Sequence, residues 1–227
     1  LSESGIVFPI VVNGNLSIGN GTTLTFLPGE IIKLTNGNFQ VYGTMVADGT
    51  ASDPIVFTSF NDDGFGGDLN GDGMVSSPAE GDWYTISLLG QNSYDGVGRF
   101  DHCYFGYGGK SYTGELSLLY FYANTYGYIK NCTIEKSQYA GLKIHSSAGL
   151  EVSNNTIINN LSDGISINSA SLSIDNCEIS GNTSNGIYCS GGGNDINNCQ
   201  IDNNGGWATI IHNAVIKDYS GNSGSGN

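Results

Sequence analysis

The chain has few basic residues: Lys and Arg together number 7 of 227, against 21 Asp and Glu. A formal net charge of −14 cannot neutralise a phosphate backbone, which argues against nucleic acid as a partner. The same charge disfavours docking on anionic lipid. Charged residues make up only 12% of the sequence, yet no apolar run reaches the roughly 20 residues of a membrane span.

Strong helix formers are also scarce. Ala, Glu, Lys and Arg are infrequent, whereas Gly alone accounts for 35 residues, a composition that suits turns and short strands. Hydrophobic residues, at 38%, are sufficient for a core. An acidic, lysine-poor sequence rich in Gly, Asn and Thr is typical of secreted proteins, so we expect a secreted or cell-surface location on a bacterial cell.

A six-residue motif recurs through the C-terminal half. Its copies span 129–134, 152–157, 174–179 and 196–201, so their first Asn residues are 23, 22 and 22 positions apart. A second motif, Gly141–Ile144, returns at 164–167 and 186–189 and in degenerate form at 208–211. Both motifs alternate apolar and polar residues, which is the periodicity of a strand.

Three short strands with tight turns use about 22 residues, and stacking such turns pairs every strand in parallel with its neighbours. We therefore predict an all-β fold, a single-stranded right-handed parallel β-helix of about eight rungs of 22–23 residues. The expected solenoid covers residues 1–219, with an inserted acidic loop at 61–82 and a flexible tail or linker at 220–227. Residues 5–12 are apolar and could fold over the first rung, and Val215 and Ile216 could start another strand.

One Asn holds the same place in each copy of the first motif, at Asn131, Asn154, Asn176 and Asn198. It lies between two inward positions, which predicts a one-residue corner in left-handed conformation, with the amides bonding one another along the stack. In these features the chain resembles the pectate-lyase-like right-handed β-helix superfamily, whose rungs carry an internal Asn ladder. The resemblance implies the fold and leaves function open, because that superfamily holds lyases, hydrolases, adhesins and phage tailspikes.

Four of the five Cys residues, at 103, 132, 177 and 199, share one inward position, and Cys189 takes an inward site on another strand. Buried Cys behaves as a small hydrophobe, so we expect stacked reduced thiols. A Cys177–Cys199 disulfide is the main alternative.

The expected insertion is strongly acidic and contains no basic residue. Asp68-Leu-Asn70-Gly-Asp72-Gly73 matches the first six positions of a calcium loop and resembles those of EF-hands and dockerins, although position 12 is Ala79 rather than Glu. The alternative is a solvated Asp/Gly turn. The candidate ligands for Ca²⁺ are Asp62, Asp63, Asp68, Asn70, Asp72, Glu80 and Asp82.

Ten of the thirteen Tyr residues lie between Tyr84 and Tyr139. Several alternate with inward residues, so they are predicted to face outward and offer flat surfaces to sugar rings. The alternative is that the rings pack beneath residues 106–113. The candidate ligand-binding residues are Tyr104, Tyr120, Tyr122, Tyr126 and Tyr128.

No catalytic residues are assigned. Asp101 and Lys130 are expected to form an ion pair, and the alternating pattern is expected to place no pair of carboxylates on one outward face. The favoured hypothesis is an extracellular, calcium-stabilised, non-catalytic module that binds or presents to polysaccharide. The alternatives are a polysaccharide lyase or glycoside hydrolase, and a structural surface protein that stacks end to end or belongs to a longer chain.

Overall fold

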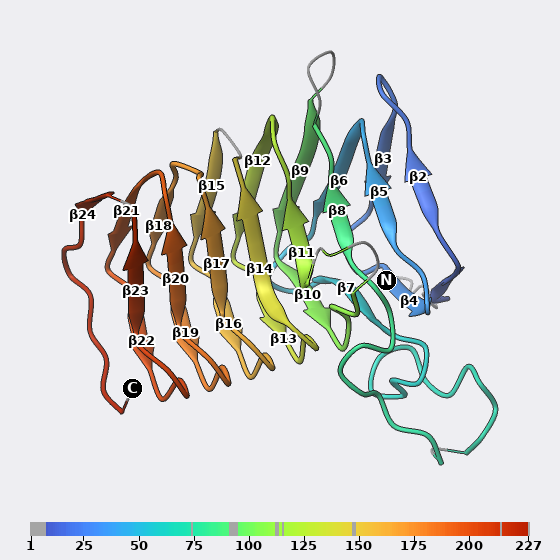
Figure 1. Cartoon of the computed structure of the whole chain (residues 1–227). Helices are drawn as coiled ribbons and strands as arrows, with labels where there is room; N and C mark the ends of the chain where they lie inside the picture. Colours follow the sequence, from blue (N-terminus) through green and yellow to red (C-terminus); the bar gives the residue numbers. More distant parts are fainter. Residues whose placement is uncertain are drawn as a thin grey trace.

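The protein is a stack of rungs in which three parallel sheets run the length of the molecule (Figure 1). This computed structural model describes residues 8–73, 75–90, 95–111, 114, 116–146, 149–213 and 215–226. Each sheet holds eight strands, one from each rung, and every strand pair within a sheet is parallel. The predicted fold class and the number of rungs are therefore confirmed.

Each rung contributes one strand to each sheet in the same order. Sheet A contains β1 (Ile10–Asn13), β4 (Ile31–Thr35), β7 (Ile55–Ser59), β10 (Cys103–Gly106), β13 (Thr133–Glu135), β16 (Thr156–Ile158), β19 (Glu178–Ser180) and β22 (Gln200–Asp202). Sheet B contains β2 (Leu16–Ile18), β5 (Phe39–Val41), β8 (Ile86–Leu88), β11 (Ser117–Phe121), β14 (Ala140–His145), β17 (Ile165–Asn168), β20 (Ile187–Ser190) and β23 (Thr209–His212). Sheet C contains β3 (Thr23–Phe26), β6 (Thr44–Asp48), β9 (Gly96–Asp101), β12 (Thr125–Lys130), β15 (Leu150–Ser153), β18 (Ser173–Asp175), β21 (Gly193–Asn197) and β24 (Val215–Asp218). Within the described part of the chain, no helix is long and apolar enough to cross a membrane.

The core changes character along the stack. In the first half it is aromatic: Phe57 meets Phe26 edge-on at 5.2 Å between ring centroids and stacks on Phe105 at 5.0 Å. In the second half the inward columns are aliphatic, as in Leu142, Ile165 and Ile187, which are register partners on β14, β17 and β20. Each such side chain contributes about 1.5–3 kcal/mol through burial.

All five Cys residues are buried free thiols, as predicted. Cys103 and Cys132 occupy the same place in successive rungs, and the backbone N–H of Cys103 donates to Cys132 Sγ at 3.4 Å. Burial raises the pKa of the Cys103 thiol and raises that of Cys189 to about 11, so both stay neutral at ordinary pH.

The corner Asn residues adopt the predicted left-handed conformation, with φ between 52° and 56° at Asn131, Asn154, Asn176 and Asn198. Their amides do not form the continuous chain that we expected. Asn176 does donate to Asn154 at 2.8 Å, but Asn131 and Asn198 donate to carboxylates of the preceding rung instead. This series is exposed to solvent, so its members can bond to whichever acceptor lies nearest.

The internal ladder lies at another corner, between sheets A and B. Asn160 donates to Asn182 and Asn182 donates to Asn204, each from Nδ2 to Oδ1 at 2.9 Å, and all three are buried. Each oxygen also accepts the backbone N–H of the residue one rung earlier, beginning at Ser137. The ladder is one reason for the recurring Gly141, Gly164 and Gly186, because a Cβ there would lie 2.8–3.0 Å from the Asn Nδ2 atoms. At Gly164 and Gly186 it would lie closer still to the side chains of Ile179 and Ile201.

The two ends differ from expectation. Residues 10–13 do not fold over the first rung; they form β1, its first strand, and pair with β4, while Phe8 and Ile10 are exposed. The rest of the expected cap, residues 5–7, lies outside the described residues. The physical reason is that Ile10–Asn13 can satisfy its backbone hydrogen bonds only by joining the edge of sheet A.

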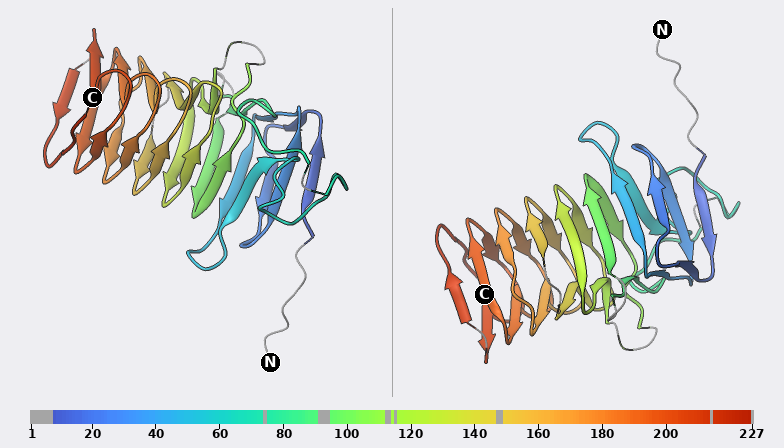
Figure 2. Two further views of the ribbon diagram at one scale, coloured as in Figure 1. Left: turned by 90° about the horizontal axis from the view of Figure 1, so that it is seen from below. Right: turned by 90° about the horizontal axis from the view of Figure 1, so that it is seen from above.

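At the other end Val215 begins β24, as expected, but residues 220–226 are not a free linker. The N–H of Ile201 donates to Ser223 O, and Asn222 Oδ1 accepts the N–H of Cys199 at 2.7 Å. The tail therefore covers the outer edge of β22 and satisfies backbone groups that the last rung would otherwise leave unpaired. Figure 2 shows the tail running along this end of the stack.

The buried ladder yields a stability prediction. Asn182→Ala removes the central amide and leaves buried donors of Asn160 without an acceptor, so we expect a loss of at least about 2 kcal/mol in unfolding free energy. The matched change, Asn176→Gly, removes an exposed amide and keeps a residue that tolerates positive φ, so its cost should stay below about 1 kcal/mol. Denaturant unfolding of both variants measures the difference, and equal costs would contradict the role of the ladder.

Candidate functional site

The acidic loop occupies residues 60–85, between β7 and β8, and projects from one end of the rungs (Figure 1). Three of the predicted ligands converge there: carboxylate oxygens of Asp63, Asp68 and Asp72 lie within 4.8 Å of one another. Asn70 joins this cluster, because its Nδ2 donates to Asp72 at 3.1 Å. The structure thus brings together four of the seven candidates.

The other three candidates hold the loop to the solenoid. Asp62 is buried and accepts hydrogen bonds from Thr58 and from the N–H of Gly64. Asp82 accepts from the Ser59 hydroxyl and the N–H of Ala79. Glu80 lies 4.0 Å from Lys136.

Backbone hydrogen bonds shape the predicted calcium motif. Asp68 accepts the N–H groups of Gly71 and Gly73 at 2.7 and 2.8 Å, and Asp72 accepts those of Val75 and Ser76 at 2.8 and 2.9 Å. Asp63 is different, because both of its carboxylate oxygens are inaccessible to solvent and neither has a hydrogen-bond partner in the described chain. A buried carboxylate without partners is costly, so Asp63 is the residue most in need of a cation.

Sequence reasoning missed a basic residue beneath the loop. Lys33 of β4 is fully buried, and its Nζ donates to Gly67 O at 2.7 Å. Burial lowers the pKa of Lys33, while the nearby charges of Asp63, Asp62 and Asp68 act in the opposite direction. Lys33 therefore supplies part of the counter-charge that the loop itself lacks. It could have been noticed as a Lys that lies between the apolar residues Ile32 and Leu34.

The five candidate Tyr residues lie on three different sheets. Tyr104 is on sheet A, Tyr120 on sheet B, and Tyr126 and Tyr128 on sheet C. Tyr122 directly follows β11 of sheet B. They cannot form one continuous platform, because the sheets face in different directions.

Tyr120 and Tyr122 do form a surface with their neighbours on sheet B. Their ring centroids are 5.8 Å apart, Tyr122 stacks on His145 at 5.1 Å, and Lys143 Nζ lies 5.5 Å from the Tyr120 ring centre. The register continues this surface along β17 and β20 with small polar side chains and one more ring, at Ser166, Asn168, Tyr188 and Ser190. We call these outward residues the sheet-B face.

The family model described as a right-handed β-helix region matches residues 84–224, which is more than half of the chain. The chain belongs to the right-handed β-helix family. Neither a search of curated proteins nor a search of solved structures found a match. Membership of this β-helix family accounts for the stacked rungs, and function has to be argued from the surfaces of this particular β-helix.

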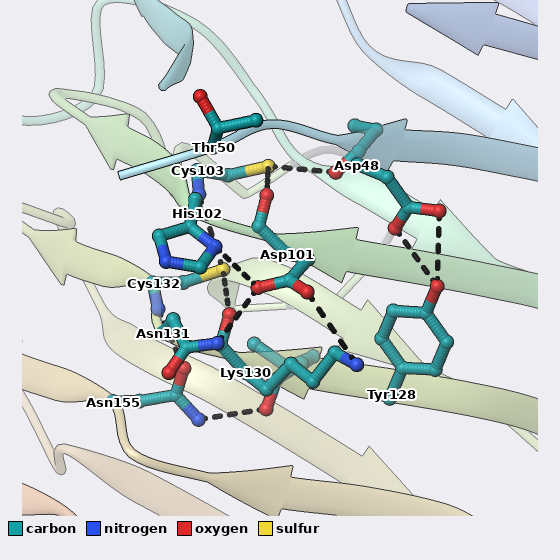
Figure 3. A network of polar contacts seen from close by, with 12 residues as sticks. Asp48, Thr50, Asp101, His102, Cys103, Tyr128, Lys130, Asn131, Cys132 and Asn155 are labelled. Carbon is teal, nitrogen blue, oxygen red and sulfur yellow. Dashed lines mark hydrogen bonds and ion pairs between the residues drawn. The ribbon is translucent and has the colours of Figure 1, made fainter. Parts of the chain in front are cut away.

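A polar network lies on sheet C and at its corner with sheet A (Figure 3). Asp101 contacts Lys130 at 3.4 Å, as predicted, and it also contacts His102 Nδ1 at 2.7 Å. The Tyr128 hydroxyl donates to Asp48 at 2.8 Å, and Lys130 Nζ lies 4.4 Å from the Tyr128 ring centre.

This network corrects one expectation. Asp48 and Asp101 are register partners on β6 and β9, so two carboxylates do stand side by side on one outward face. The repeat did not reveal the pair, because the acidic loop separates the two strands in the sequence. Both carboxylates are already engaged, Asp48 by Tyr128 and Asp101 by Lys130 and His102.

Asp101 should make stability depend on pH. Burial acts to raise its pKa, but the hydrogen bond from Asn131 and the charges of His102 and Lys130 outweigh burial and lower it. A folded pKa below the unfolded value, about 3.9, adds stability above that pH, and the gain is lost as pH falls through the folded pKa.

We therefore expect Asp101→Asn to cost about 1–2 kcal/mol near pH 6, and its difference from the parent to shrink below about pH 4. Urea unfolding across this range measures it. Glu178→Gln, an exposed acid on β19, reports the general effect of removing one negative charge. A difference that stays constant with pH would rule out the assignment.

Proposed function

We propose that this β-helix is an extracellular or cell-surface module that binds polysaccharide along the sheet-B face without cleaving it, and that Ca²⁺ stabilises its acidic loop. The observation that carries the proposal is the cluster of Tyr120, Tyr122, Lys143 and His145 on adjacent strands. Aromatic rings offer flat apolar faces to sugar rings, and their polar neighbours offer hydrogen bonds to hydroxyls.

The shape of the sheet-B face suits a polymer. Successive rungs are about 4.8 Å apart, so side chains at one repeat position form a straight row. From Tyr120 the row passes through Lys143 and Ser166 to Tyr188, over four successive rungs. A solenoid presents such a row as a long shallow surface, which fits an extended chain better than a compact ligand.

The groups on that face support a role in binding rather than hydrolysis. The side chains of the row and of its neighbours at His145, Asn168 and Ser190 include no carboxylate. Hydrolysis by general acid and base requires two carboxyl groups flanking the bond. The Asp48–Asp101 pair lies on sheet C, so it cannot reach a chain bound on sheet B.

Calcium is supported by the geometry of Asp63, Asp68 and Asp72. Three carboxylates within 4.8 Å repel one another, and Lys33 offsets only part of that charge. Carboxylate and amide oxygens are the ligands that Ca²⁺ prefers, and Asn70 adds an amide to the set. An ion here would fix a Gly-rich loop whose ordering otherwise costs much conformational entropy.

The sugar-binding proposal is tested with a matched pair of Tyr variants. Tyr122 and Tyr126 are each 40% exposed, but Tyr122 lies on the sheet-B face and Tyr126 on sheet C. On a polysaccharide that retains the parent protein in affinity electrophoresis, Tyr122→Ala should weaken binding about tenfold, roughly 1.4 kcal/mol. Tyr126→Ala should bind like the parent.

A reducing-end and unsaturated-end assay on the same polysaccharide should detect no product. Product that disappears in a Lys143→Ala variant would show instead a lyase or hydrolase of the pectate-lyase-like type. If the polysaccharide retains the Tyr122→Ala and Tyr126→Ala variants equally weakly, the binding surface is not the sheet-B face.

The calcium proposal is tested by thermal unfolding. The midpoint should rise with the logarithm of Ca²⁺ concentration above the value in chelator, because the ion binds only the folded loop. Asp63→Asn should abolish this rise, whereas Glu178→Gln should keep it. Identical midpoints of the parent protein with calcium and with chelator would show that the acidic cluster binds no ion.

A further inference from the structure

The corner between β9 and β10 departs from the repeat. His102 occupies it with a φ of 47°, whereas the same corner in the four following rungs carries Asn131, Asn154, Asn176 and Asn198. Asn and His both tolerate this left-handed backbone, so the backbone permits an imidazole here without requiring one. His102 is therefore a change of side-chain chemistry at an unchanged backbone corner.

The imidazole lies against Asp101, and this close contact lacks hydrogen-bond geometry. Nδ1 lies 2.7 Å from Asp101 Oδ1, and Asp101 is itself fixed by the Asn131 amide at 2.8 Å. Figure 3 shows the other ring nitrogen, Nε2, turned away from Asp101. In the described residues nothing bonds to Nε2, so this atom is available to a ligand.

A cavity of about 400 Å³ adjoins this ring. Its apolar side is formed by Val56 and Tyr104, which are partners on β7 and β10, together with Pro54 and Phe65. Phe65 comes from the acidic loop and packs on the Tyr104 ring at 5.0 Å between centroids. The Tyr104 hydroxyl donates to Glu135 at 2.9 Å, which holds this ring in place.

Polar side chains also line the cavity. Thr50, His102, Asn131 and Thr133 line it and provide both donors and acceptors. The Asn131 amide nitrogen is already bonded to Asp101, which leaves its carbonyl oxygen as an acceptor. An apolar floor with a few convergent polar groups is the usual composition of a small-molecule site.

We propose that this cavity, which we call the His102 pocket, binds a single neutral sugar ring. The ring would lie on Tyr104 and Phe65, with its hydroxyls bonded to His102 Nε2, Asn131 and the two Thr side chains. Thr50 Oγ1 already bonds Ser52 and Asp53, but a purely aromatic ligand would leave His102 Nε2 without a partner. An anionic sugar is disfavoured, because Asp101 and Glu135 lie beside the pocket and the whole chain carries −14. The pocket is distinct from the sheet-B face and does not depend on it.

The test uses the whole chain and methyl glycosides of glucose, galactose, mannose and N-acetylglucosamine, with galacturonic acid as a charged comparison. At least one neutral glycoside should shift the imidazole C–H resonances of His102 in a saturable titration. His102→Asn installs the residue that the other corners use, so it should fold normally, with an unchanged thermal midpoint. His102→Asn should nevertheless weaken glycoside binding at least about tenfold, and Phe65→Ala should do the same. Binding to both variants is monitored through the ring resonances of Tyr104.

The control is Tyr122→Ala, which alters the sheet-B face and should leave glycoside binding to the pocket unchanged. The proposal is overturned if no neutral glycoside shifts His102, if His102→Asn binds as tightly as the parent, or if galacturonic acid binds best. A glycoside that shifts His145 rather than His102, and whose binding is lost in Tyr122→Ala, would overturn the pocket while supporting the sheet-B proposal.

Discussion

In-register parallel hydrogen bonding between successive rungs is the constraint on which the rest of this structure depends. Because each strand pairs with its counterpart one rung away, every side chain stands directly beside the residue at the same repeat position. Columns of like residues follow: Phe57 on Phe105, and Ile165 beside Ile187. Apolar columns bury well in this arrangement, but polar columns persist inside only if their members can bond one another.

The Asn ladder meets that requirement. A side-chain amide has both a donor and an acceptor. Asn182, for example, accepts from Asn160 of the previous rung through Oδ1 and donates to Asn204 of the next rung through Nδ2. An ionised Asp in the same place could only accept, so it could not do both for its neighbours. In the last rung Asn204 also donates to the backbone oxygens of Ile179 and Asp202.

The candidate calcium cluster and the His102 pocket lie where insertions interrupt the repeat. The acidic loop enters between β7 and β8 and extends one rung, and Phe65 from it closes one side of the His102 pocket. The β6–β7 turn supplies Thr50 and Pro54 to the same pocket. A regular rung has only short turns and leaves a flat surface. These two insertions project beside the sheet, so a concave pocket forms between them and the strands.

The sequence by itself determined the fold, because a step of 22 residues with alternating polarity can bury its apolar positions in few other ways. It also determined the inward Cys position and the left-handed corner at Asn131 and its equivalents. The buried ladder left a signal that was available, an Asn three residues after each of Ile157, Ile179 and Ile201.

Only the tertiary structure decided which polar groups meet. Asp48 lies one rung away from Asp101, and Lys33 lies one rung away from the strand that leads into the acidic loop. The sequence does not predict these contacts, because the length of an insertion does not reveal which strand it passes. Contacts within the regular repeat follow from its period, while contacts made by insertions depend on the path of the loop in space.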